Sequence, residues 1–141
     1  MEISIIENGL TVEIYDKIRQ TAGFLNYEKE DITYALSHSL YSVVVYDSAR
    51  PVGIARIVGD NRIAFFIKDV VAIPEYQHKG IGKILMAYLF KYIDKHAAHN
   101  AYVGLMSTPG KEAFYKKFGF IERPTEGYGS GMVLFYDRKT K

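Results

Sequence analysis

Residues 69–82 read DVVAIPEYQHKGIG and join a β-branched apolar run to two spaced glycines, Gly80 and Gly82, which open a long helical pattern. A strand that runs into a helix start brings several unpaired backbone N–H groups to one place. Together with the positive end of the helix dipole, these groups form an anion site. Glycine lacks the Cβ atom that would hold a phosphate away from the main chain, and Lys79 and Lys83 add positive charge. The stretch therefore predicts a diphosphate site.

The spacing of the glycines narrows the choice of ligand. A P-loop requires Gly-Lys-Ser/Thr, whereas Gly82 is followed by Lys83 and Ile84, and a Rossmann fingerprint requires a third glycine. The run QHKGIG instead resembles the Q/R-x-x-G-x-G/A signature of the GCN5-related N-acetyltransferases (GNAT), whose amides hold the diphosphate of acetyl-coenzyme A. The resemblance implies that the coenzyme contacts Gln77, His78, Lys79, Gly80, Ile81, Gly82 and Lys83.

A second family mark is the run AFYKKFGF at residues 113–120, which resembles the segment (F/Y)-Y-x-x-x-G-F of the same family. The resemblance implies that Tyr115 is the general acid that protonates the departing thiolate. A thiol has a pKa of about 8.5 and a phenol one of about 10, so this proton transfer is only modestly uphill. The alternative is that Tyr115 merely packs. Many family members also carry an asparagine near the start of this helix, where this chain has STPG at 107–110.

Asp69 is the candidate base. An amine with a pKa of about 10.4 is almost wholly protonated at neutral pH, so its attack on a thioester requires a proton acceptor. Asp69 precedes the proposed coenzyme-binding main chain and could accept that proton directly or through a water; alternatively it is a salt-bridged structural group. The resemblance further implies that the main chain of Val70, Val71 and Ala72 pairs with the pantetheine arm as an extra strand would. One of these amides would polarise the thioester carbonyl.

Composition limits the class of protein. The chain has 141 residues, of which 48% are hydrophobic and 24% charged, which predicts one globular domain over residues 1–141. The resemblance implies that this single domain is an acetyltransferase domain. The net charge of +2 gives no argument for a nucleic acid or a membrane as partner. Because there is no cysteine, the acetyl group must pass directly from donor to acceptor. The absence of a leader pattern and of an apolar run near about 18 residues predicts a cytoplasmic protein.

Apolar periods and turn residues predict the order β-α-α-β-β-β-α-β-α-β-β. The strands are expected at 2–6, 41–46, 51–58, 62–73, 102–106, 120–122 and 131–136, and the helices at about 12–22, 28–38, 80–96 and 108–119. Short polar connections predict an antiparallel meander, and the long helical crossover predicts a parallel pair. The fold class is therefore α/β, a mixed, mostly antiparallel sheet with a parallel, splayed strand pair and flanking helices, which is also the order of the GNAT fold.

The connector Phe24-Leu25-Asn26-Tyr27 separates the first two predicted helices. In the resembled family this connector helps to form the acceptor pocket, which implies substrate contacts at Phe24 and Tyr27; alternatively the connector only staples the helices together. His96 and His99 lie three apart, but no further ligand completes a coordination set, so no metal is predicted.

The function implied by the resemblance is transfer of acetyl from acetyl-coenzyme A to a primary amine of a small molecule. The alternatives are a non-catalytic coenzyme A sensor, an acetyltransferase acting on protein N-termini or lysines, and an RNA- or protein-binding module with a fortuitous glycine turn. Because dimers are common in the family, a homodimer is a further expectation that the sequence leaves open.

Overall fold

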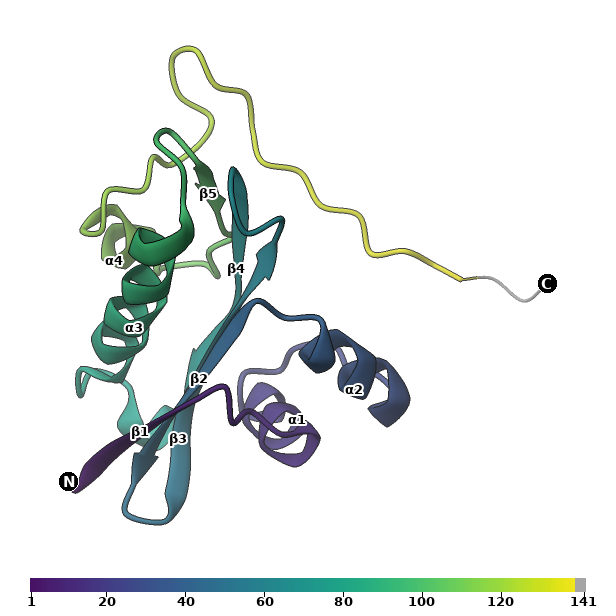
Figure 1. Ribbon diagram of the computed structural model, residues 1–141, viewed down its shortest axis with the longest axis vertical. Helices are drawn as coiled ribbons and strands as arrows, with labels where there is room; N and C mark the ends of the chain where they lie inside the picture. Colours follow the sequence, from purple (N-terminus) through teal and green to yellow (C-terminus); the bar gives the residue numbers. More distant parts are fainter. Residues whose placement is uncertain (139–141) are drawn as a thin grey trace. The chain divides into compact units, whose positions relative to one another are not determined.

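The computed structural model describes residues 1–138 (Figure 1). Its elements, in chain order, are β1 (Ile3–Glu7), α1 (Val12–Thr21), α2 (Lys29–Ser37), β2 (Tyr41–Asp47), β3 (Arg50–Gly59), β4 (Ala64–Ala72), the 3₁₀ turn η1 (Pro74–Tyr76), α3 (Ile81–His96), β5 (Tyr102–Gly104) and α4 (Glu112–Lys116). The chain divides into two compact units, Met1–Leu105 and Met106–Lys141, which are described in turn. No helix in the described part of the chain is long and apolar enough to cross a membrane.

The first unit is built on one five-stranded sheet in the order β1-β2-β3-β4-β5. The first four strands pair antiparallel, and β4 and β5 pair parallel, as the meander and the helical crossover predict. The parallel pairing is short, because it joins only Ala64–Phe66 to Tyr102–Gly104. The fold class predicted from the sequence is therefore confirmed.

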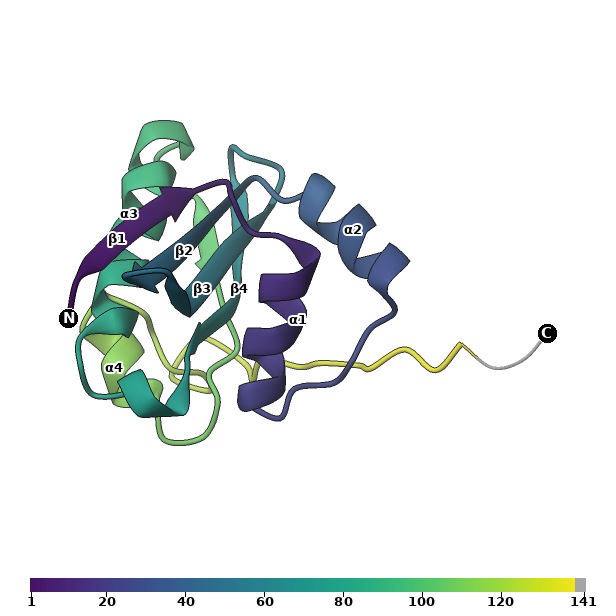
Figure 2. The same ribbon diagram turned by 90° about the horizontal axis from the view of Figure 1, so that it is seen from below.

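Helices cover both faces of this sheet: α3 lies on one face, and α1 and α2 lie on the other (Figures 1 and 2). This arrangement explains why every residue of β2 from Tyr41 to Val45 is buried, since a strand covered on both faces has no polar side. The face of α3 that meets the sheet carries Ile81, Leu85, Met86, Leu89 and Ile93.

Gly53 on β3 fixes where α3 begins. A Cβ atom at Gly53 would stand 2.5 Å from the Ile81 side chain, so only glycine lets the first turn of α3 approach the sheet this closely. Ile81 is almost fully buried there. The sequence predicts that the start of α3 binds an anion, and the packing of Ile81 on Gly53 fixes the position of this helix start on the sheet.

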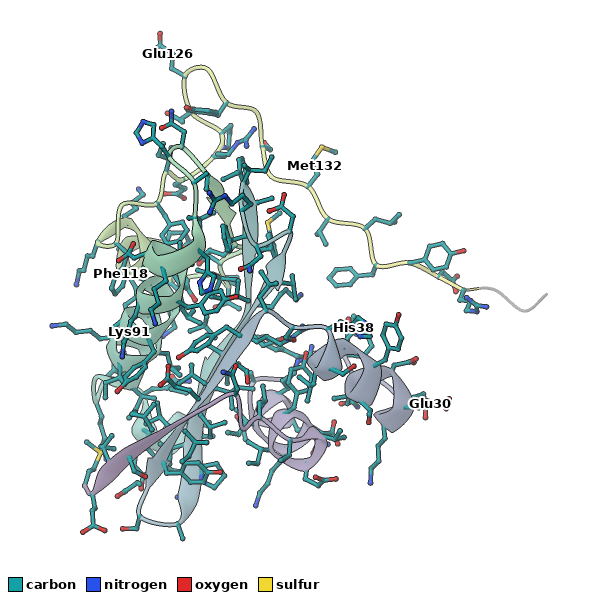
Figure 3. All side chains as sticks on the ribbon, viewed as in Figure 1. Glu30, His38, Lys91, Phe118, Glu126 and Met132 are labelled. Atoms are coloured by element: carbon teal, nitrogen blue, oxygen red, sulfur yellow. The ribbon has the colours of Figure 1, made fainter. Side chains whose placement is uncertain are left out.

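The second unit is described over residues 106–138, and here two predictions are wrong in detail. The expected strands at 120–122 and 131–136 are not formed; the described part of this unit contains only an isolated bridge between Thr125 and Tyr128. An apolar run becomes a strand only where another strand pairs with its backbone. Residues Met132–Tyr136 are instead extended and exposed, and Met132 stands on this segment in Figure 3.

The helix of the second unit is also shorter than predicted. It begins after Lys111 instead of at Thr108, because Gly110 adopts φ +88° and the Lys111 N–H closes a turn on the Thr108 carbonyl at 3.2 Å. Gly119, at φ +96°, follows the helix as the sequence predicts.

Candidate active site

The junction between β4 and α3 is a tight turn whose backbone twice enters the left-handed region. His78 has φ +62° and Gly80 has φ +85°. The Gln77 side-chain amide donates a hydrogen bond of 3.3 Å to the Ala72 carbonyl, which ties the turn to the end of β4. Residues 77–80 are exposed. The turn therefore presents its backbone outward.

The first turn of α3 offers free amide groups. The Ile84 N–H donates the first hydrogen bond of the helix, to the Gly80 carbonyl at 3.1 Å. The N–H groups of Ile81, Gly82 and Lys83 precede it, and helix geometry gives them no acceptor within the helix. Gly80 is the N-cap and supplies no side-chain bond, and the first turn carries no acidic residue. Lys79 and Lys83, both exposed, flank these groups. The helix start is thus chemically suited to an anion.

The surface in front of Gly80 is open. A Cβ atom built on Gly80 would meet no heavy atom of the described protein within 4 Å. An anion could therefore reach the main chain at this point, and the first methyl group added there would occupy that space. The residues present fit a diphosphate.

Val70, Val71 and Ala72 lie at the end of β4, next to this turn. On one side Val71 pairs with Ile54 and Ala72 with Gly53 of β3. On the other side β5 pairs with β4 only as far as Phe66, so within the described residues of the first unit no strand pairs with that edge of Val70–Ala72. A free strand edge of this kind can hydrogen-bond an extended ligand.

Asp69 is buried in a cluster of three donors. Its Oδ1 accepts a hydrogen bond of 3.0 Å from Arg19 Nε, and its Oδ2 accepts bonds from Tyr15 Oη at 2.6 Å and Arg56 Nε at 3.0 Å. The Asp69 side chain is 3% exposed, and those of Arg19 and Arg56 are 8% and 10% exposed. These contacts are those expected of a salt-bridged structural group, which is the second of the two roles that the sequence analysis left open for Asp69.

The phenol of Tyr15 is part of the same cluster. Burial, followed by the charge of Asp69 and the hydrogen bond to it, raises the pKa of Tyr15 to about 12. The phenol therefore stays protonated at neutral pH and donates to Asp69. It also accepts a long hydrogen bond of 3.5 Å from Arg56 Nη2. Tyr15 thus joins the arginine of β3 to the carboxylate of β4.

Asp69 also marks a break in the regular pairing of β4. The register runs from Ile54 opposite Val71 to Arg56 opposite Lys68, so two residues of β4, Asp69 and Val70, face one residue of β3. This is a β-bulge, and Asp69 adopts φ +58° within it. The bulge lies immediately before the strand end for which the family resemblance implies contacts with the thioester.

The connector between α1 and α2 is organised around Arg19. Arg19 Nη1 donates a hydrogen bond of 2.8 Å to the Leu25 carbonyl. The guanidinium carbon lies 5.3 Å from the ring centre of Phe24 and 5.2 Å from that of Tyr27. Tyr27 remains 50% exposed. The structure therefore brings Phe24, Tyr27 and Asp69 together through one arginine.

Tyr115 lies on α4 of the second unit. Its ring packs edge-on against Phe114 and Phe120, with ring centres 5.1 and 6.2 Å away. Burial raises the pKa of the phenol above its ordinary value. The group is therefore protonated at neutral pH, as an acid must be, and its catalytic role stays a prediction.

The sequence analysis did not single out Tyr15, Arg19 or Arg56. Two signals were present: Arg19 shares the apolar face of its helix with Tyr15 and Ile18, and Arg56 interrupts the apolar run of β3. A charged residue on a buried face requires a partner, and Asp69 is the acidic residue within the apolar strand β4.

Among the described residues no group of three or more His, Cys, Asp or Glu side chains is placed to hold a metal ion.

Comparison with known proteins identifies relatives. A family model described as an acetyltransferase (GNAT) domain matches residues 12–140. The chain is 31% identical over 135 residues to GCN5-related N-acetyltransferase 1, chloroplastic, of Arabidopsis thaliana, covering 94% of this chain and 66% of that protein. It is also 31% identical over 121 residues to serotonin N-acetyltransferase 2, chloroplastic, of Oryza sativa, covering 82% of this chain and 59% of that protein.

Solved structures show the same architecture. The crystal structure of a probable acetyltransferase of unknown function from Staphylococcus aureus is similar, with a TM-score of 0.86 and 30% sequence identity. The match covers 95% of this chain and 99% of that one.

Proposed function

The chain belongs to the GNAT acetyltransferase family, and we propose on that premise that it transfers acetyl from acetyl-coenzyme A to a primary amine of a small molecule. The observation that carries the choice of donor is the start of α3. There the first turn of α3 has amides without intrahelical partners, the space in front of Gly80 is open, and the exposed Lys79 and Lys83 stand beside it in the chain. A diphosphate is the ligand that this arrangement suits.

In this proposal two regions of the protein bind acetyl-coenzyme A. The turn and first helical turn bind the diphosphate through Gln77, His78, Lys79, Gly80, Ile81, Gly82 and Lys83. The free edge of β4 at Val70, Val71 and Ala72 hydrogen-bonds the pantetheine arm, and one of these amides polarises the thioester carbonyl. When bound, acetyl-coenzyme A supplies an activated acetyl group, and no metal takes part.

The proposed transfer is direct; the chain has no cysteine, so an acetyl-cysteine intermediate is excluded. The neutral amine nitrogen bonds to the carbonyl carbon, the carbon–sulfur bond breaks, and Tyr115 gives its proton to the departing thiolate. Asp69 is the proposed acceptor of the amine's proton, directly or through a water. Both oxygens of Asp69 already accept hydrogen bonds, so the alternative to a base is a structural carboxylate held in ion pairs.

The acceptor side is formed by Phe24 and Tyr27. Exposed aromatic surface favours an acceptor with an aromatic or apolar body, since stacking adds to apolar burial. The rice relative named for serotonin, an arylalkylamine, supports the same class. The buried cluster beneath holds two guanidinium groups and one carboxylate, and its surplus positive charge disfavours a multiply charged polyamine.

A homodimer and a cytoplasmic location stay predictions; the two plant relatives are both named as chloroplastic. The protein is not proposed to bind nucleic acid or a membrane surface, because its net charge is only +2.

An amine panel tests the proposal. Release of free coenzyme A thiol is followed with acetyl-coenzyme A and arylalkylamines, polyamines, amino sugars and peptides with free N-termini or lysines. The proposal predicts turnover with small amines, highest with arylalkylamines. Donor binding without turnover on any amine would instead indicate a sensor, and turnover on peptides alone would indicate a protein acetyltransferase.

A further inference from the structure

We propose that Tyr15, Arg19 and Arg56 form one positioning unit that holds the β4 bulge at Asp69, and that Arg19 links this bulge to the acceptor-side connector. The inference deepens the proposed function and rests on it in two respects. In the proposed function the connector contacts the acceptor, and the end of β4 after the bulge contacts the thioester. The link itself consists of contacts within the first unit.

The bulge requires something to hold it. Asp69 at φ +58° occupies a region that side chains other than glycine rarely adopt, although aspartate and asparagine tolerate it better than most. Neither Asp69 nor Val70 has a partner residue in the β3 register. A backbone of this kind persists where the surroundings over-determine it.

The three donors supply that constraint. Arg19 binds one carboxylate oxygen, while Arg56 and Tyr15 bind the other, so the carboxylate is fixed from both sides. The donors come from α1 and β3, which are both parts of the packed core. Arg56 is itself held by Ser39 Oγ at 3.2 Å. The direction of the Asp69 side chain, and with it the turn of the backbone, is thus set by neighbours outside β4.

Arg19 alone reaches the connector. One guanidinium group bonds Asp69 through Nε, bonds the Leu25 carbonyl through Nη1, and stacks against Phe24 and Tyr27. Lysine carries the same charge but lacks the planar fork that serves two acceptors and two ring faces together. A displacement of the connector must therefore move the guanidinium group, and with it the carboxylate of the bulge.

The experiment compares Arg19→Lys with Ile18→Val. Ile18 is buried on the same helix but is apolar, so its truncation loosens α1 without removing a donor. Amide hydrogen exchange is measured over peptides 22–28 and 66–73, together with kcat, acceptor KM and the affinity for acetyl-coenzyme A.

For Arg19→Lys we expect faster exchange in both peptides at once, a raised acceptor KM and a kcat lower by about 10²-fold, since small misplacements have effects of this size. The affinity for acetyl-coenzyme A should stay within about twofold, because the start of α3 is untouched. Ile18→Val should keep wild-type kcat and wild-type exchange in both peptides. A loss of kcat in Ile18→Val equal to that of Arg19→Lys would mean that α1 stability alone is responsible, and would overturn the proposal.

Faster exchange confined to the connector, or wild-type exchange in both peptides, would also overturn it. If Arg19→Lys does not fold, Tyr15→Phe replaces it: this change removes one donor to Asp69 without altering charge, and the proposal predicts faster exchange in 66–73 and a lower kcat. A base role for Asp69 without this positioning role predicts wild-type exchange in 66–73 for Tyr15→Phe, so the exchange rate separates the two roles. If the wild type transfers no acetyl group, the proposed function fails while the exchange data still test the link.

Discussion

Arg19 Nε lies 3.0 Å from Asp69 Oδ1, although the two residues are 50 positions apart in the chain. Both side chains are buried, and the second carboxylate oxygen is bound by Arg56 and Tyr15. The contact joins the first helix to the strand that leads into the proposed donor site. Its consequences for stability, pH dependence and catalysis can each be measured.

Asp69→Asn should destabilise the fold strongly. The change leaves two buried guanidinium groups without a compensating charge, and breaking a buried ion pair in this way lowers the free energy of unfolding by about 3–5 kcal/mol. Urea denaturation measures the loss. The matched control is Glu75→Gln, which breaks the exposed ion pair between Glu75 and Arg50 and should change stability little. Equal effects of the two substitutions would contradict the importance of the buried cluster.

Because the pKa of the Tyr15 phenol is raised, we expect the free energy of unfolding to fall in alkaline solution. Its pKa is raised from 10.0 to about 12, mainly by burial, so folding favours the protonated phenol. That contribution is fully present below pH 10 and is lost as the pH rises through about 12. Denaturation midpoints between pH 9 and pH 12 should therefore fall less steeply in Tyr15→Phe than in the wild type. The exposed Tyr34→Phe is the control and should follow the wild-type curve.

Tyr115→Phe should lower kcat by about 10²–10⁴-fold, which is the usual contribution of a positioned acid. The affinity for acetyl-coenzyme A should not change, because the phenol is not a binding group in this account. Since burial raises the pKa of Tyr115, loss of the acid's proton should not lower the wild-type kcat until the pH exceeds the ordinary value for a phenol. Stopped assays across pH give both results, and a variant as fast as the wild type would rule Tyr115 out as the acid.

Gly80→Ala should weaken donor binding by about tenfold or more, equal to at least about 1.4 kcal/mol. The added methyl group would meet no atom of residues 1–138 within 4 Å and would therefore stand in the space proposed for the diphosphate. Gly127→Ala is the matched control, because Gly127 has the same φ of +85° and equally open surroundings. Both changes introduce similar backbone strain, so similar losses of thermal stability are expected. Only Gly80→Ala should raise the dissociation constant of acetyl-coenzyme A.

The sequence predicted the first unit well for local reasons. Apolar runs and turn residues indicated where its strands end, such as Asn8-Gly9 after β1 and Gly59-Asp60-Asn61 between β3 and β4, and the repeated apolar face of α3 required a sheet to pack against. The turn between β4 and α3 was also predicted, because glycine spacing and the adjoining strand and helix are properties of neighbouring residues, and its binding of a diphosphate stays a prediction.

The features that sequence reasoning missed depend on distant residues. Nothing local to Asp69 shows that Arg19 and Arg56 reach it, because α1 and β3 meet β4 only after the sheet has formed. The run at Met132–Tyr136 has the composition of a strand, but pairing decides whether such a run becomes one. Thr108 and Pro109 likewise have helix-start chemistry, and Gly110 moved the start of α4 to Glu112.

The proposed donor site at the start of α3 is the central claim, and calorimetric titration with acetyl-coenzyme A tests it most directly. The account predicts saturable binding to the wild type, weaker binding to Gly80→Ala, and a thermal stabilisation that at about 100 times the dissociation constant corresponds to about 2.7 kcal/mol. Absence of both heat and stabilisation at millimolar acetyl-coenzyme A, in a protein that unfolds cooperatively, would contradict it.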